Sequence, residues 1–302
     1  MADEEEDDVF GGTDDGAEDR PLNEEELIDR SVVVNMTKRH RVVVFVDMLG
    51  FSKLTEEHPL QPNIFEELQR PGAVEFLRAS LEGMEANSLT ERFIRFHLLI
   101  GQVAREVRLV EDGSSITFSD CAFFATDNLH YAIEYAWKVM YHTMEQRIPV
   151  RVGIGYGEFL VVRIKADFGL TNEDHVVQFL GSGVARAYAA EHCGIKGQRV
   201  LIHPSVERLF EHEAHQPMYR SKTRWQFPMP LPDAELTNSV GVTKEINYLW
   251  HPKHDDMYWA SVNEMRAASP EVQHVHYDAT LAAINRMRLT MDRPLMASPA
   301  KD

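Results

Sequence analysis

Cysteine is scarce in this sequence, which contains only Cys121 and Cys193 among 302 residues. Two cysteines make no disulfide framework, and their scarcity fits a reducing cytoplasm. No apolar run reaches the ~20 residues that a membrane-spanning helix needs, and the run at 42–46 is cut short by Asp47. The first residues are acidic where an export signal would be basic. We therefore expect a cytoplasmic protein that does not enter a membrane.

Positive charge is also scarce, with 31 Lys and Arg against 48 Asp and Glu and a formal net charge of -17. Residues 1–30 hold fourteen acidic residues and two Arg, so they carry -12 and leave -5 to the rest of the chain. Because this segment has few apolar residues, we expect 1–35 to be a disordered acidic tail, either solubilising or partner-binding. A net-acidic chain without a basic cluster argues against a nucleic-acid-binding surface.

Strand and helix patterns fill the rest of the chain, and their order predicts an α+β protein whose helices cover a mostly antiparallel sheet. We place the folded domain at 36–260, with 216–259 as an extension or a sheet edge, and a C-terminal helix and tail at 261–302. The expected elements are a buried strand at 41–47, helices at 62–84 and 91–106, a hairpin turning at Ser119-Asp120, a helix at 128–146, a second hairpin turning near Tyr156-Gly157, a helix at 182–192, a strand and Pro-started helix within 197–210, and helical spacing over 260–291.

Two carboxylates, Asp47 and Asp120, follow apolar strands and lie beside the turn-forming residues Gly50 and Ser119. A carboxylate buried alone is costly, whereas two from neighbouring strands can share one or two divalent cations. This arrangement is typical of sites that hold a metal-nucleotide complex. The alternative is that Asp47 caps a helix and Asp120 is an ordinary hairpin residue.

The segment after Asp47 is predicted to open a helix, and helix starts favour anions. We expect the backbone N–H groups of Leu49, Gly50, Phe51 and Ser52 to hold phosphates. Gly50 would let the backbone turn closely past them.

Five short motifs in one order resemble the class III nucleotidyl cyclase family, over about residues 40–212. The motifs comprise Phe45, Asp47, Gly50, Phe51 and Ser52; Asp120 in its hairpin; Arg151, Gly153, Ile154 and Gly157; Gly181 and Val184; and the strand 197–201. The resemblance implies the cyclase fold. It also implies that Asp47 and Asp120 bind two metal ions, with the Met48 carbonyl as a further oxygen ligand.

Departures from the family pattern fall at the positions that read the base and support the transition state. The two base-facing positions are Ile116 and Gln178, and the positions of the usual Asn and Arg are Ala185 and Ala189. Arg186 lies nearby and is the first choice for the arginine that offsets phosphoryl charge, with Arg151 the second. This combination resembles the Pycsar pyrimidine cyclases of bacterial antiphage defence.

That resemblance implies a phosphorus-oxygen lyase that converts UTP to 3′,5′-cyclic UMP and diphosphate. It further implies a homodimer with active sites at the subunit interface, two Mn²⁺ ions per site with Mg²⁺ possible, and a product that acts on a separate effector. Ile116 would give an apolar wall, and the Gln178 amide can donate or accept, so it suits uracil and cytosine alike. The alternatives are a cytidylate cyclase, an adenylyl or guanylyl cyclase of the same fold, and an inactive nucleotide-binding scaffold.

Overall fold

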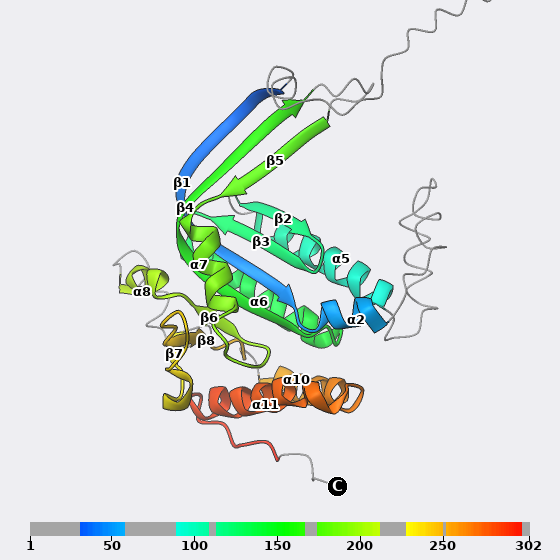
Figure 1. The fold of residues 1–302 in the computed structure, drawn as a ribbon. Helices are drawn as coiled ribbons and strands as arrows, with labels where there is room; N and C mark the ends of the chain where they lie inside the picture. Colours follow the sequence, from blue (N-terminus) through cyan, green and yellow to red (C-terminus); the bar gives the residue numbers. More distant parts are fainter. Residues whose placement is uncertain are drawn as a thin grey trace, which may run out of the picture. The chain divides into compact units, whose positions relative to one another are not determined.

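The computed structural model describes residues 31–57, 89–108, 113–166, 174–211, 228–249 and 252–297, and the predicted helix at 62–84 lies outside them. The described residues fall into two compact units, one with 31–36, 162–166 and 174–178 and the other with the rest. The smaller unit contains the first residues of β1 (Ser31–Met48), the last residues of β4 (Val150–Ala166) and most of β5 (Asp174–Leu180), which pairs with β4 (Figure 1). The remaining elements belong to the larger unit.

The sheet runs in the order β2-β3-β1-β4-β6-β8-β7. The β1–β3, β2–β3, β6–β8 and β7–β8 pairs are antiparallel, whereas β4 and β6 are parallel. Its further strands are β2 (Ser114–Phe118), β3 (Cys121–Thr126), β6 (Val200–Ile202), β7 (Pro228–Pro230) and β8 (Lys244–Ile246). The α+β prediction is therefore confirmed, and β7 and β8 show that 228–249 extends the sheet.

Strand β1 is buried on both faces because its apolar side chains alternate between two cores. Val42, Val44 and Val46 join the larger core, whereas Val43 and Phe45 join a smaller one. This alternation explains the unbroken apolar run in the sequence. It also places Asp47 on the same face as Phe45.

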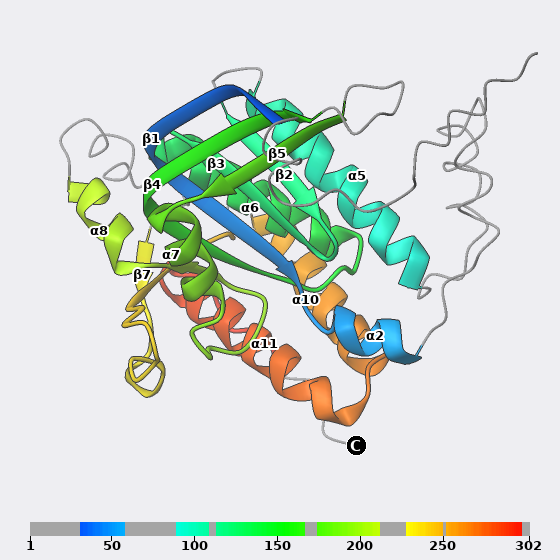
Figure 2. The same cartoon turned by 45° about the horizontal axis from the view of Figure 1, so that its top comes forward.

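Helices cover both faces of this sheet in the larger unit. Residues of α5, α6, α10 and α11 build the larger core, while Ala187 of α7 packs in the smaller one, so α6 and α7 lie on opposite faces of β1 (Figures 1 and 2). The helices are α2 (Phe51–Glu57), α5 (Leu89–Arg108), α6 (Leu129–Glu145), α7 (Ser182–Glu191), α8 (Pro204–Glu211), α10 (Pro252–Ala267) and α11 (His274–Leu289), with short 3-10 helices η1 (Asp233–Glu235) and η2 (Glu271–Gln273). No helix of the described segments is long and apolar enough to cross a membrane.

The helical spacing predicted over 260–291 corresponds to the end of α10 and to α11, which are separated near Pro270. Proline disfavours the helical conformation at the residue before it and removes a backbone donor, so the chain breaks there and restarts through η2.

The predicted hairpin turn at Tyr156-Gly157 is wrong, because β4 continues through both residues. The glycines that suggested a turn instead allow α7 to lie directly on the strand. A Cβ at Gly155 would lie 2.4 Å from the Ala187 nitrogen, and one at Gly157 would lie 2.5 Å from Ser182 Oγ. Glycine here serves close packing between helix and strand.

We expect Gly155→Ala to lower the free energy of unfolding by about 1–3 kcal/mol, because the added methyl would force α7 away from β4. Gly101→Ala is the matched control, since a Cβ there has nothing within 4 Å. That change should raise the free energy of unfolding by about 0.5–1 kcal/mol, because alanine is more stable than glycine inside a helix. Urea unfolding of both variants makes the comparison, and equal shifts would contradict the packing role of Gly155.

Candidate active site

Asp47 and Asp120 meet at one end of the β1–β3 pair. Asp47 lies opposite Cys121 in the strand register, and the Met48 N–H donates to the Asp120 carbonyl over 3.0 Å. The predicted tight turn at Ser119-Asp120 is present, and Ser119 adopts a positive φ of 48°. Strand pairing and this turn together bring the two acidic residues side by side.

The electrostatic environment of Asp47 opposes its ionisation. Burial raises the pKa of Asp47 to about 7, and the charges of Glu191 and Asp120 act in the same direction. His192 and Arg151 oppose this increase in pKa without cancelling it. A partly buried carboxylate among other carboxylates is a position where a cation would be strongly favoured.

Glu191 was not predicted from the sequence as a site residue, and with Asp120 it is one of two carboxylates that act on Asp47. Its side chain is fully buried at the end of α7, and Arg151 binds its Oε1 through Nε at 2.6 Å and Nη2 at 2.5 Å. His192 also contacts it. The sequence could have indicated that Glu191 is buried, because helical spacing places it on the same face of α7 as Ala187.

The two arginines proposed for the transition state are both held by the protein. Arg151 is partly buried, pairs with Glu191 and also donates to the Ile195 carbonyl over 3.0 Å. Arg186 donates to the Tyr156 carbonyl over 2.8 Å. Of these two arginines, Arg151 acts on Asp47, whereas Arg186 is held against β4.

Part of the turn after Asp47 is already hydrogen-bonded within the protein. The Leu49 N–H, predicted to hold phosphate, donates to the Pro149 carbonyl over 2.8 Å. Gly50 adopts a φ of 77°, a conformation that favours glycine, and is exposed. Helix α2 then begins at Phe51, as predicted, and the Phe51 ring lies 5.9 Å from that of Phe93. The Leu49 N–H is therefore already engaged within the protein and is not available to the phosphate that it was predicted to hold.

Of the predicted base-facing residues, Ile116 lies on the same face of the sheet as Asp47. It pairs with Phe123, which in turn pairs with Phe45, and directly opposite residues of paired strands share a face. Gln178 is in β5, in the smaller unit, and its side chain lies outside the described residues.

His97 of α5 is a further residue near the pair that the sequence gave no reason to select. Its Nε2 lies 2.6 Å from the Ser119 carbonyl, so it contacts the turn that carries Asp120. Burial lowers the pKa of His97, although the contact with Ser119 and the charge of Asp120 oppose that shift. The imidazole helps to fix the turn.

Two carboxylates with a neighbouring backbone carbonyl are the hard oxygen donors that Mg²⁺ and Mn²⁺ prefer. The described segments contain no group of three or more His, Cys, Asp or Glu side chains able to hold a metal ion. The site thus fits a cation that takes its remaining ligands from water and from a bound phosphate, and does not fit an ion enclosed by protein.

The raised pKa of Asp47 predicts a specific dependence of stability on pH. Unfolded Asp47 loses its proton near 3.8, whereas the folded residue keeps it until about 7. Stability due to this residue therefore falls as pH rises through that window. We expect wild type to lose about 1–2 kcal/mol relative to Asp47→Asn between about pH 4 and about pH 8, allowing for partial solvent screening. Urea unfolding across this range measures it, and parallel curves for the two proteins would contradict it.

Comparison with known proteins gives structural likenesses only, because no family model and no curated protein matches the chain. The catalytic core of a rhodopsin-guanylyl cyclase with converted specificity, in complex with ATPαS, is 13% identical over 70% of this chain and 97% of its own, with a TM-score of 0.41. A dimeric guanylyl cyclase domain of the fungus Blastocladiella emersonii is 14% identical over 70% and 97%, with a TM-score of 0.40. A Trypanosoma brucei adenylate cyclase in its monomeric state is 14% identical over 70% and 90%, with a TM-score of 0.39.

Proposed function

We propose that this protein is a nucleotidyl cyclase that converts a pyrimidine nucleoside triphosphate, UTP in the first place, to its 3′,5′-cyclic monophosphate and diphosphate. The observation that carries the proposal is the pairing of Asp47 with Asp120 at the β1–β3 end, where the Met48 N–H donates to the Asp120 carbonyl over 3.0 Å. Burial and like charge raise the pKa of Asp47 to about 7 there. A structural role gives no reason to gather acidic groups in this way.

The reaction is intramolecular. The 3′-oxygen forms a bond to the α-phosphorus and releases its proton, while the bond from the α-phosphorus to the diphosphate oxygen breaks. Asp47, Asp120 and the Met48 carbonyl would hold the Mn²⁺ or Mg²⁺ ions. When bound, such cations supply positive charge that acidifies the hydroxyl and stabilises the leaving phosphate. The residues of the turn from Gly50 to Ser52 would orient the triphosphate through backbone N–H groups.

Arg151 and Arg186 have different roles in this reaction. Arg151 holds Glu191 in place and thereby sets the charge around Asp47, so it is a positioning residue. Arg186 remains the candidate for the α-phosphoryl charge. In a homodimer with sites at the interface, Arg186 of one copy would serve the two carboxylates of the other.

A small base is favoured by the position of Ile116, which gives the Asp47 face of the sheet an apolar side chain in place of a charged purine-reading one. Gln178 would read the edge of the base. Because an amide can pair with either pyrimidine, cytidylate cyclase is the second candidate. We further propose that the cyclic product acts in the cytoplasm on a separate effector, as a signal of phage infection.

A homodimer is supported by aromatic side chains on the face of the sheet that carries the smaller core. Phe45, Phe123 and Phe179 pack together there, while Phe118 and Tyr188 remain 48% exposed beside them. Large exposed aromatic side chains next to a core are typical anchors of a protein interface.

We expect Phe118→Asp to weaken self-association about tenfold or more, because a charge would replace an apolar anchor. Leu289→Asp is the control, since Leu289 is 56% exposed at the end of α11 and should leave the dimer intact. Sedimentation at several concentrations measures both. A wild-type protein that is active yet monomeric throughout would contradict the interface.

The substrate is tested by incubating purified protein with Mn²⁺ and each of ATP, GTP, CTP and UTP, and identifying products by mass and retention. Cyclic UMP as the main product is the expected result, and cyclic CMP would transfer the assignment to the second candidate. Cyclic AMP or cyclic GMP would retain a cyclase and refute the pyrimidine assignment. No product from any of the four would favour the inactive scaffold.

A further inference from the structure

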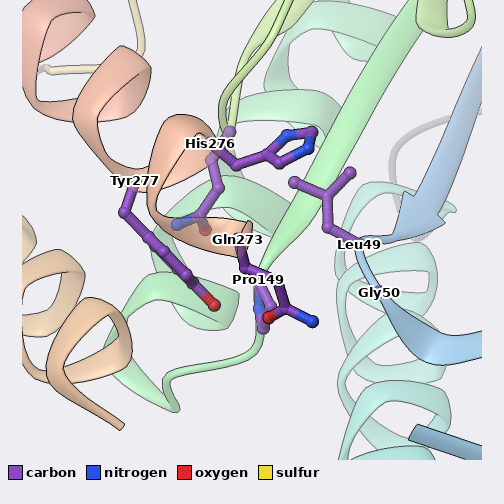
Figure 3. A pocket seen from close by; sticks show the side chains of 7 residues that line it. Leu49, Gly50, Pro149, Gln273, His276 and Tyr277 are labelled. Carbon is purple, nitrogen blue, oxygen red and sulfur yellow. The ribbon is translucent and has the colours of Figure 1, made fainter. Parts of the chain in front are cut away.

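A pocket of about 80 Å³ lies between the turn after β1 and the start of α11, and neither Asp47 nor Asp120 lines it. Figure 3 shows the Leu49 side chain directed towards His276. Gly50 is exposed while Gln198 is fully buried, so the pocket runs from the surface to the interior. The lining residues are Leu49, Gly50, Pro149, Gln198, Gln273, His276 and Tyr277.

The most informative residue of the lining is Gln198. Its backbone is fixed, because its N–H donates to Thr280 Oγ1 over 2.9 Å and its carbonyl accepts from the Tyr248 hydroxyl over 3.1 Å. Its side-chain amide is different, since both Nε2 and Oε1 lack a partner among the described residues. A buried amide with a donor and an acceptor unsatisfied is costly, and such groups in folded proteins ordinarily have partners.

The rest of the lining indicates an uncharged ligand. None of the seven residues is Asp, Glu, Lys or Arg. Burial lowers the pKa of His276, with Lys196 and Arg151 adding to the effect, so this imidazole is neutral near pH 7. Its buried Nδ1 also lacks a partner among the described residues. Leu49, Pro149 and the Tyr277 ring supply apolar contact around these polar groups.

We propose that this pocket binds a small uncharged molecule whose N–H and C=O lie on one edge, such as a primary amide or a lactam. The Gln198 amide matches that edge, because it offers one acceptor and one donor side by side. The size of the pocket agrees with such a ligand. An apolar cavity of about 150 Å³ accommodates benzene. A pocket of about 80 Å³ would therefore hold the polar end of a small ring, with the rest of the ring at the mouth.

Binding there would also contact the turn that the proposed function assigns to phosphates. A Cβ at Gly50 would lie 3.5 Å from Gln273 Nε2, so α11 already borders the turn. An occupant held between Leu49 and His276 would connect them further. The binding itself does not depend on the cyclase assignment, and it is tested without a nucleotide.

The experiment uses the full chain and two probes that differ in one hydrogen-bond donor. Saturation-transfer NMR titrations follow 2-pyrrolidinone, a lactam, and N-methyl-2-pyrrolidinone, which lacks the N–H. We expect saturable binding of the lactam, with the methylated ring at least about tenfold weaker because it leaves the buried acceptor unsatisfied. Equal binding of the two probes, or no saturable binding of either, would overturn the proposal.

Two variants assign that binding to this pocket. Gln198→Leu removes both polar atoms at similar volume, so it should fold at least as stably as wild type and bind the lactam at least about tenfold more weakly. Gln273→Trp changes a half-buried residue at the mouth and should block entry whether or not the first variant folds. Unchanged lactam binding in Gln198→Leu, or in Gln273→Trp should Gln198→Leu not fold, would locate the binding elsewhere and refute the proposal.

Discussion

Asp47→Ala and Asp120→Ala are each expected to lower cyclic nucleotide formation by at least about 10³-fold, roughly 4 kcal/mol of transition-state stabilisation. Each change removes a carboxylate from the β1–β3 end, where the two residues lie side by side. The effects should not add, because either single change would leave too few ligands for the two proposed cations. Product formation under saturating UTP and Mn²⁺ measures both variants and the double variant.

Asp127→Ala is the matched control, because Asp127 follows the opposite end of the same strand, β3. Its exposed carboxylate pairs with Arg41 over 2.9 Å, away from Asp47 in the strand register. This variant should keep activity within about threefold, as expected for an exposed carboxylate outside the site. Activity retained in either Asp47→Ala or Asp120→Ala, with the fold intact, would show that the pair does not perform the chemistry.

The second large effect is expected at Glu245, whose replacement by Ala should lower the free energy of unfolding by about 3–5 kcal/mol. Glu245 is fully buried on β8 and contacts Arg199 and Arg286. Arg199 also binds Glu235 through Nη2 at 2.9 Å and is itself fully buried. Without Glu245, the Arg199 guanidinium would remain buried with its charge under-compensated.

Glu264→Ala is the control for this prediction, since Glu264 pairs with Arg147 at the surface, where both side chains are more than half exposed. Exposed pairs contribute about 0–1 kcal/mol, so the control should unfold close to wild type. Urea unfolding at one pH compares the two. Similar decreases in the free energy of unfolding for Glu245→Ala and Glu264→Ala would show that the buried pairing of Glu245 with Arg199 does not matter to stability.

Much of the architecture could be predicted because local patterns and tertiary structure agree. The run at 42–46 is buried on both faces of a central strand, and Asn128 begins α6 as its cap. The Ser119-Asp120 turn could also be predicted, because two turn-forming residues separate two apolar segments. These features depend on neighbours in sequence, and they include the two carboxylates of the candidate site.

The errors and omissions share a cause, which is dependence on a distant partner. Gly155 and Gly157 suggested a turn, although their role is set by the approach of α7. The Leu49 N–H was assigned to phosphate, yet it binds the carbonyl of Pro149, a hundred residues away. Glu191 acts on Asp47 only because β1 and α7 meet in the fold. Sequence spacing alone carries no information about such long-range contacts.

The most direct test of cyclisation at the Asp47–Asp120 pair is the stoichiometry of products from UTP. Purified protein is incubated with UTP and Mn²⁺, and 3′,5′-cyclic UMP, linear UMP, UDP and diphosphate are quantified together. The prediction is one diphosphate for each cyclic UMP, with little linear nucleotide, because the attacking oxygen belongs to the substrate. Linear UMP with diphosphate, or UDP with phosphate, would show hydrolysis by water and contradict the proposed reaction.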